Sequence, residues 1–187
     1  MKLEYDKNDN VEKQEFNLKK EIFSWIETLV ISLIAVALII TFVGRMMRVD
    51  GSSMEKTLHH GDRIITTSIH GDYKYNDVVV VRRKGDTPIV KRVIALSGDK
   101  IDINFETGSV YVNDKLLSEP FINEITKNPI NFDGPVVVPE GHVFVMGDNR
   151  NLSDDSRNAK IGMIDERNIF GKVIFRLFPL SKMGKID

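Results

Sequence analysis

The sequence predicts a mainly β protein in which an N-terminal transmembrane helix is followed by an antiparallel β-sheet domain. Two observations lead to this prediction. One long apolar run occupies residues 22–43, and the rest of the chain consists of short runs rich in β-branched residues, separated by Gly, Asn, Asp and Pro. Short strands between turn residues are typical of antiparallel sheets. At 187 residues, 42% hydrophobic and 28% charged, the chain has room for one globular domain and an appendage.

The N-terminal region predicts a tail over residues 1–21 and a membrane anchor over residues 22–47. The tail is polar, charged and without apolar periodicity, which indicates disorder. As a helix, Ile22–Val43 spans about 33 Å, which matches the core of a bilayer. Glu27 and Arg45 lie near its two ends, where charged side chains can reach the interface. A cleaved signal peptide would have a shorter apolar core and an A-x-A-like exit, so an uncleaved anchor is favoured over a cleaved signal or a buried core helix.

Beyond the anchor, short runs rich in β-branched residues and separated by Gly, Asn, Asp and Pro predict eight strands. They are residues 63–67, 77–82, 89–96, 100–104, 109–112, 136–138, 142–146 and 172–177. The turn residues at 106–108 and 113–114 predict a hairpin around the strands 100–104 and 109–112. A single short helical turn is expected at residues 165–168.

Composition and charge exclude several classes of function. A net charge of −1 and a pI of about 6.4 do not give the basic surface expected of a nucleic-acid-binding protein, so no nucleic-acid partner is predicted. The absence of cysteine excludes disulfide scaffolds, thiolate zinc sites and a cysteine nucleophile. The four histidines show neither an H-E-x-x-H pair nor any other metal-ligand spacing, so no metal or cofactor is predicted.

An unusually polar segment, GDNRNLSDDSR at residues 147–157, lies between two apolar runs. Its charged residues Asp148, Arg150, Asp155 and Arg157 can close complementary ion pairs, with bidentate geometry available at each arginine. Its Asn and Ser side chains can hydrogen-bond to the backbone. Taken alone, such a segment is better interpreted as a solvated loop. Two other segments favour a functional interpretation.

These segments are GSSMEKTL at residues 51–58 and VKRVIALSGD at residues 90–99. In this order along the chain, the three segments resemble the type I signal peptidases of bacteria, whose boxes read G-x-S-M-x-P-T-L, K-R-V-I-G-L-P-G-D and G-D-N-R-x-N-S-x-D-S-R. The resemblance covers about residues 49–180, and its last box is highly specific. The sequence departs from the family at four positions, where the family has Pro, Gly, Pro and Asn: Lys56, Ala95, Ser97 and Leu152.

The resemblance implies a membrane-bound serine endopeptidase that removes N-terminal signal peptides from secretory preproteins. It implies a catalytic domain of the signal-peptidase type over residues 48–187, with a small inserted β subdomain at about residues 100–141. Substrates would carry small residues at positions −1 and −3 of the cleavage site. The charge bias across the anchor is slight. The resemblance therefore decides the orientation: the tail is cytoplasmic, and the domain is extracytoplasmic at the lipid bilayer of the plasma membrane.

The resemblance makes Ser53 the nucleophile and Lys91 its general base. No nucleophile-elbow motif or Ser-His-Asp arrangement is suggested by the sequence, and a lysine can serve as the base instead. Such a lysine has to be neutral, and its pKa must fall from about 10.4 by burial or a nearby cation. In a strand, Lys91 shares its face with the apolar Ile89 and Val93, and Arg92 points to the opposite face.

Other residues of the three boxes are predicted to support this pair. By resemblance, Ser153 hydrogen-bonds to Lys91 and orients it, while the charged residues of the polar segment brace the loop. The oxyanion would be bound by the Ser53 backbone N–H and by a second donor at the position of Gly51, which has no side chain to offer. The supporting residues are Gly51, Met54, Arg92, Asp148, Arg150, Ser153, Asp155 and Arg157.

Two other functions remain open at this point. One is a self-cleaving regulator that uses the same pair of residues, although its relatives are soluble and lack an anchor. The other is a membrane-tethered β domain that has lost catalysis and serves as an accessory protein in pilus or surface-protein assembly. The four departures are compatible with this second function, whereas the presence of both Ser53 and Lys91 favours an enzyme.

Overall fold

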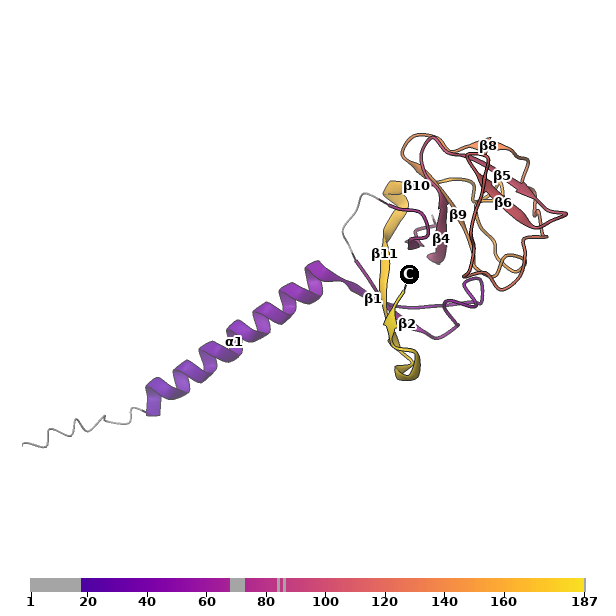
Figure 1. Cartoon of the computed structure of the whole chain (residues 1–187). Coiled ribbons are helices and arrows are strands. Elements are labelled where there is room, and N and C mark those ends of the chain that lie inside the picture. Colours follow the sequence, from indigo (N-terminus) through magenta and orange to yellow (C-terminus); the bar gives the residue numbers. More distant parts are fainter. Residues whose placement is uncertain (1–17, 68–72, 84, 86, 187) are drawn as a thin grey trace, which may run out of the picture. The chain divides into compact units, whose positions relative to one another are not determined.

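The computed structural model describes residues 18–67, 73–83, 85 and 87–186, with no side-chain environment for residues 38–43. The tail predicted over residues 1–21 therefore lies largely outside the described residues. The chain forms two compact units, one ending at Leu38 and the other beginning at Ile39, and each is considered by itself. The first unit contains most of helix α1, Leu18–Val43 (Figure 1).

Helix α1 carries apolar side chains around its whole circumference. Phe23, Trp25 and Ile31 are all exposed, as expected for a helix without an amphipathic face. The hydroxyls of Thr28 and Ser32 donate to backbone carbonyls one turn earlier, at 2.9 and 2.7 Å, so these polar groups are satisfied within the helix. Among the helical residues whose side chains are described, none forms a segment long and apolar enough to cross a membrane. Residues 38–43 of the predicted anchor lie outside this comparison.

The end of α1 differs from the prediction. The helix ends at Val43, and Arg45–Arg48 forms strand β1, which pairs in antiparallel fashion with β2, Arg63–Thr66. Residues 45–47, predicted as part of the anchor, thus belong to the sheet. Gly44 lies between helix and strand at a close approach: a Cβ there would stand 2.8 Å from the Ile65 side chain and 2.9 Å from a backbone oxygen. Glycine permits this passage because it has no side chain.

The second unit is built on an eight-stranded antiparallel sheet. Its strand order is β1-β2-β11-β3-β4-β9-β10, with β12 paired to β11. The remaining strands of this sheet are β3 (Val78–Val81), β4 (Ile89–Ala95), β9 (His142–Met146), β10 (Ile164–Asp165), β11 (Ile169–Phe178) and β12 (Gly184–Lys185). Strand β4 is central, between β3 and β9, and it carries Lys91 and Arg92.

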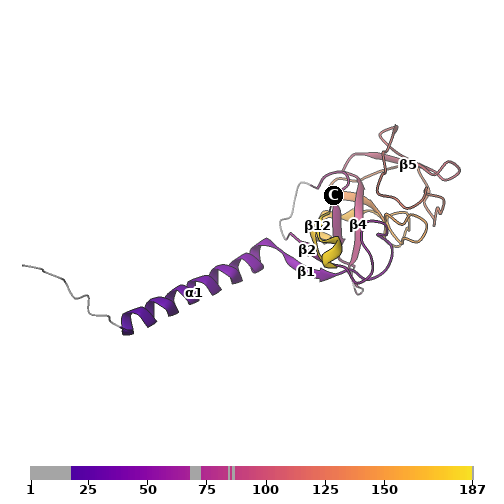
Figure 2. The same ribbon diagram turned by 60° about the horizontal axis from the view of Figure 1, so that its bottom comes forward.

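A second sheet of four strands, in the order β7-β6-β5-β8, is formed within the predicted insert. Its strands are β5 (Lys100–Asn104), β6 (Ser109–Val112), β7 (Lys115–Leu116) and β8 (Val136–Val137). The predicted hairpin is confirmed as β5 paired with β6. Asn113 and Asp114 have positive φ angles, as a tight turn between β6 and β7 requires. In both views, β5 lies on the side of the domain away from β1 and β2 (Figures 1 and 2).

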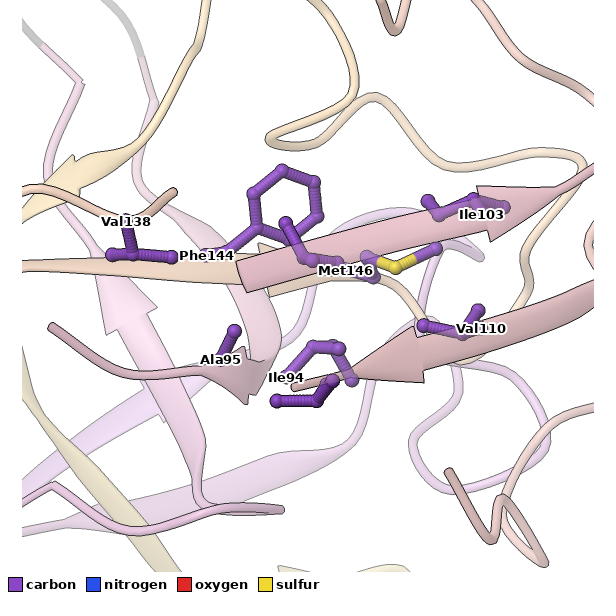
Figure 3. Packing of buried hydrophobic residues seen from close by; sticks show 9 residues of the cluster. Ile94, Ala95, Ile103, Val110, Val138, Phe144 and Met146 are labelled. Atoms are coloured by element: carbon purple, nitrogen blue, oxygen red, sulfur yellow. The ribbon is translucent and has the colours of Figure 1, made fainter. Parts of the chain in front are cut away.

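Three apolar clusters hold the second unit together. One joins the two sheets: Ile94, Phe144 and Met146 of the main sheet pack against residues of β5 and β6 (Figure 3). The other two clusters are divided by the alternation of side chains along β4, since Val90 packs with one and Val93 with the other. Strand β4 is thus buried on both faces, which explains how two adjacent cations can lie inside the protein.

The eight predicted strands are all present, and the expected helical turn appears as the 3-10 turn η1, Glu166–Asn168, capped by the Asp165 side chain. Strand β11 begins three residues earlier than predicted. Four short strands, β1, β7, β10 and β12, were not predicted, because β1 was assigned to the anchor and the other three have only two residues each without a β-branched run. A further 3-10 turn, η2 at Leu180–Lys182, precedes β12.

Candidate active site

The structure brings together the two residues on which the sequence prediction depends. Ser53 lies in the serine turn, residues 51–58, which follows β1, and Lys91 lies in β4. Lys91 Nζ donates a hydrogen bond to Ser53 Oγ at 2.7 Å. A hydroxyl and an amine at this separation can exchange a proton directly, since general-base catalysis needs heavy atoms about 2.6–3.2 Å apart.

Lys91 is almost completely buried, with 2% of its surface exposed. Burial is the main cause that lowers its pKa from 10.5 to about 8. The carboxylates of Asp155 and Asp154 oppose this shift, whereas the guanidinium groups of Arg83 and Arg157 add to it. A substantial fraction of Lys91 is therefore neutral in mildly alkaline solution, which is the state that a base requires.

The serine turn is anchored by its apolar residues. Met54 and Leu58 are buried in the same cluster, and the Leu58 N–H donates to the Met54 carbonyl at 2.8 Å. The polar loop, residues 147–157, approaches this turn closely at Gly147. A Cβ at Gly147 would collide with the Ser53 carbonyl oxygen and the Ser153 side chain, so this position accepts only glycine.

Asn149 of the polar loop makes two contacts with the serine turn. Its backbone N–H donates to the Ser53 carbonyl at 3.0 Å, and its side-chain Nδ2 donates to the Ser52 carbonyl at 3.2 Å. Asn149 is buried. The sequence analysis did not assign it to the site. Its type and position within the polar loop were the available signal, and they indicated only hydrogen bonding to some part of the backbone.

Arg92 points away from Lys91, as predicted, and forms a buried ion pair with Asp148 of the polar loop. Its Nε and Nη2 each donate to a different oxygen of Asp148 at 2.9 Å, and Nη1 donates to the Asn76 carbonyl at 2.8 Å. The Thr57 hydroxyl also donates to Asp148. Both Arg92 and Asp148 are fully buried. Asp148 therefore pairs with a strand residue rather than within its own loop.

The two arginines of the polar loop behave differently from each other. Arg157 forms the predicted bidentate pair with Asp155, at 2.8 and 2.9 Å. Arg150 was expected to pair within the loop, but its Nη2 lies 2.5 Å from Glu119 Oε1, in the segment between β7 and β8. Of the three carboxylates in the loop, Asp148 is bound by Arg92 and Asp155 by Arg157, while the exposed Asp154 accepts from Asn158 Nδ2.

Two supporting residues do not adopt the interactions expected of them. The Ser153 hydroxyl is buried beside Gly147. Within the described residues it has no hydrogen-bond partner, so its expected bond to Lys91 is not formed. Gly51 is exposed with φ of 94°, and its N–H donates to His60 Nδ1 at 3.3 Å.

The four departures from the family pattern lie away from the Ser53–Lys91 pair. Lys56 and Leu152 are exposed, and Ala95 is buried in the cluster between the two sheets. The Ser97 hydroxyl donates to the His142 carbonyl at 3.1 Å. Among the described contacts, none of these four side chains forms a hydrogen bond or ion pair with Ser53 or Lys91. Over the described part of the chain, no group of three or more acidic, His or Cys side chains could hold a metal ion.

Comparison with known proteins identifies the family. The model of the family "Signal peptidase, peptidase S26" matches residues 22–178. The chain belongs to this family. It is therefore a serine peptidase, and so a hydrolase. Its similarity to signal peptidase I of Bacillus licheniformis is 37% identity, over 94% of this chain and 99% of that protein.

Other members are similar over nearly their whole length. Signal peptidase I S of Bacillus subtilis is 35% identical, over 97% of this chain and 100% of the relative. Signal peptidase IB of Staphylococcus aureus is 32% identical, over 88% and 94%. A signal peptidase I structure from Enterococcus faecalis matches with 25% identity and a TM-score of 0.47, over 56% of this chain and 98% of that one. These relatives do not support the alternative of an accessory protein without catalysis.

Proposed function

We propose that this signal peptidase cleaves secretory preproteins at the membrane surface, with Ser53 as nucleophile and Lys91 as general base and general acid. The observation that supports this mechanism is the 2.7 Å separation of Lys91 Nζ and Ser53 Oγ, combined with the burial of the lysine. The pKa of Lys91, lowered to about 8, places its neutral form within reach of physiological conditions. Because only neutral Lys91 accepts a proton, activity should rise with pH through this value.

The reaction follows from the positions of these groups. Neutral Lys91 takes the proton of Ser53 Oγ as this oxygen attacks the scissile carbonyl carbon, and the negative charge that develops on the carbonyl oxygen is bound by the Ser53 N–H. The Lys91 ammonium then gives its proton to the leaving amine as the C–N bond breaks, which leaves an acyl-enzyme ester on Ser53. Water, deprotonated by Lys91, attacks the ester and releases the signal peptide, and the proton returns to Ser53.

The placement of the enzyme at the bilayer is part of the proposal. Residues 1–21 form a cytoplasmic tail, residues 22–47 include the single-pass anchor, and residues 48–187 form the extracytoplasmic peptidase domain with its insert at about residues 100–141. The apolar circumference of α1 supports the anchor, since its apolar side chains are exposed within the described residues of that unit, 18–37. Ser53 follows Val43 by a chain long enough for about 35 Å at most, which would keep the reaction close to the membrane.

The substrates are preproteins with small side chains at positions −1 and −3. The basis for this preference is the family, whose members are signal peptidases. An extended peptide bound as an added strand would present alternate side chains to the site.

The test uses the full chain in detergent with a labelled preprotein that carries an A-x-A cleavage site. We expect cleavage after the second alanine, identified by the mass of the product, and background cleavage with Ser53→Ala. Ser52→Ala is the matched control because it removes the neighbouring hydroxyl, and it should retain most activity. A preprotein with Leu at position −1 should be cleaved poorly. Equal cleavage by wild type and Ser53→Ala would refute the mechanism.

A further inference from the structure

The direction of the oxyanion donor depends on the peptide unit between Ser52 and Ser53. In a planar trans peptide, the C=O and N–H groups point in opposite directions. A group that holds the Ser52 carbonyl on one side of this unit therefore aims the Ser53 N–H at the other side. Among the described residues, the Ser53 N–H takes part in no hydrogen bond, so it is available to an oxyanion.

Asn149 holds the peptide units on both sides of the nucleophile. Its side-chain Nδ2 donates to the Ser52 carbonyl at 3.2 Å, and its own N–H donates to the Ser53 carbonyl at 3.0 Å. The two carbonyls flank the Ser53 Cα, so this pair of bonds fixes the orientation of both peptide planes. With 4% of its surface exposed, Asn149 makes these bonds with little competition from water.

The two hydrogen bonds from Asn149 also connect the Ser53 N–H to strand β4, which carries Lys91. The Ser52 carbonyl accepts a second bond, from the Glu55 N–H at 3.1 Å, but Glu55 belongs to the same turn and moves with it. Asn149 belongs to a different element and follows Asp148 directly, and Asp148 is bound by Arg92 of β4 through two bonds of 2.9 Å. The residue before Arg92 is Lys91. One short path therefore sets the Ser53 N–H relative to the Lys91 amine.

We propose that Asn149 is a positioning residue that aims the Ser53 N–H at the oxyanion formed during cleavage. This inference rests on the proposed function, because it assumes attack by Ser53. The side-chain amide of Asn149 touches no reacting atom, and it acts through the peptide unit that it holds. Gly51 cannot contribute a side-chain donor, and its N–H is bound to His60. Binding of the oxyanion therefore depends more strongly on the direction of the Ser53 N–H than it would in a site with a second donor.

The experiment compares wild type with Asn149→Ala in the full chain in detergent, at a pH where the rate has reached its alkaline plateau. Removing one oxyanion donor lowers kcat by about 100- to 1000-fold, and a donor that is only misaligned should lose less. We expect kcat to fall by about 10- to 100-fold while KM stays within about twofold. The pH at half-maximal rate should not move, because the surroundings of Lys91 are unchanged.

A peptide aldehyde supplies the readout that a purely structural role would not change. Ser53 Oγ adds to the aldehyde carbon and the C=O π bond opens, with the serine proton passing to Lys91 or to the new oxygen, so the hemiacetal oxygen occupies the oxyanion position. The Ki of the aldehyde should rise by the same factor as kcat/KM falls. The Kd of a matched peptide that ends in an amide should stay unchanged, because it forms no oxyanion.

Two further variants keep the test decisive. Asn149→Leu keeps a similar side-chain volume and the backbone N–H but removes the donor without adding a charge, and it replaces Asn149→Ala if that variant does not fold. Asn151→Ala is the matched control, since Asn151 Nδ2 also donates from the polar loop to a backbone carbonyl, that of Ile125, at 3.2 Å. It should change neither kcat nor the aldehyde Ki by more than about twofold.

Each contrary result has a distinct meaning. If wild type cleaves the preprotein and the Asn149 variants keep kcat within about threefold, the positioning role is wrong. It is also wrong if kcat falls while the aldehyde Ki stays constant, or if the pH at half-maximal rate shifts. If wild type and Ser53→Ala cleave equally, the proposed function fails instead.

Discussion

Lys91 and Arg92 are consecutive cations in the same strand, and the fold buries both, with 2% and 0% of their surfaces exposed. Their surroundings are opposite. Arg92 donates two bonds to Asp148 and one to a backbone carbonyl, and its guanidinium lies 4.1 Å from the centre of the Phe121 ring. Lys91 donates to the Ser53 hydroxyl, and over the described residues it forms no ion pair.

The difference shows how one strand can supply both structure and chemistry. A buried cation that donates to a carboxylate and a carbonyl fixes the elements around it. A buried cation that donates to a hydroxyl loses more solvation than the nearby carboxylates compensate, so its pKa falls and its proton becomes exchangeable. Because side chains alternate along a strand, adjacent residues can face these two environments. The structural role of Arg92 and the catalytic role proposed for Lys91 both depend on burial of the side chain.

The largest expected effect concerns the Lys91 face. Lys91→Met keeps the length of the side chain but removes the base, so cleavage of the labelled preprotein should fall to background, at least about 1000-fold. The double variant Ser53→Ala/Lys91→Met should be no worse than either single variant, because the two residues act as one unit. Rates are measured with the full chain in detergent. Cleavage by Lys91→Met at the wild-type rate would show that another group activates Ser53.

The next effect concerns the Arg92 face. Asp148→Ala leaves the Arg92 charge buried without its partner, which should lower the free energy of unfolding by about 3–5 kcal/mol. Replacing both residues by apolar ones, in Arg92→Met/Asp148→Leu, should restore much of this stability. Denaturant titrations of the full chain in detergent give these values.

A matched control for this ion pair is Arg167→Ala. It removes the pair with Asp165 but keeps the backbone N–H that the Asp165 cap binds, and the Arg167 side chain is 89% exposed, so its effect on stability should be small. A loss of stability in Asp148→Ala no larger than in this control would contradict the structural role given to the buried pair.

The smallest effect in the comparison is the increase in the free energy of unfolding that we expect for Lys91→Met. The folded pKa of Lys91 is about 8 and its ordinary value is 10.5. Below pH 8 the lysine is charged in both states, so the folded protein carries the whole penalty of burying that charge. Lys91→Met should therefore raise the free energy of unfolding by about 3 kcal/mol at pH 6–7.

This gain should depend on pH in a defined window. Between pH 8 and 10.5 the folded wild type has released its proton while the unfolded chain still holds it, so wild-type stability rises with pH and the advantage of Lys91→Met shrinks. Above that window the lysine is neutral in both states, and the penalty disappears. Unfolding curves of wild type and Lys91→Met from pH 6 to pH 11 measure the difference in their free energies of unfolding. A constant difference over this range would mean that Lys91 is not destabilised by burial of its charge.

The sequence by itself determined the main elements of the fold. Short runs rich in β-branched residues and bounded by turn residues, such as Lys100–Asn104 and His142–Met146, have the same bounds as β5 and β9. The alternation of side chains along a strand predicted that Arg92 points away from Lys91, and the two side chains bind different partners, Asp148 and Ser53. The pairing of Ser53 with Lys91 came from resemblance between boxes rather than from spacing, since 38 residues separate them.

Tertiary structure alone decided which charged groups meet and where the helix gives way to the sheet. Asp148, Arg150 and Glu119 found partners across elements, and nothing in a local pattern states which of several nearby carboxylates an arginine will reach. The change from helix to strand at Gly44 depends on the approach of β2, which is distant in sequence. Asn149 acquired its contacts with the serine turn in the same way. Local periodicity is set by the backbone of one segment, whereas ion pairs and clamps depend on packing between segments.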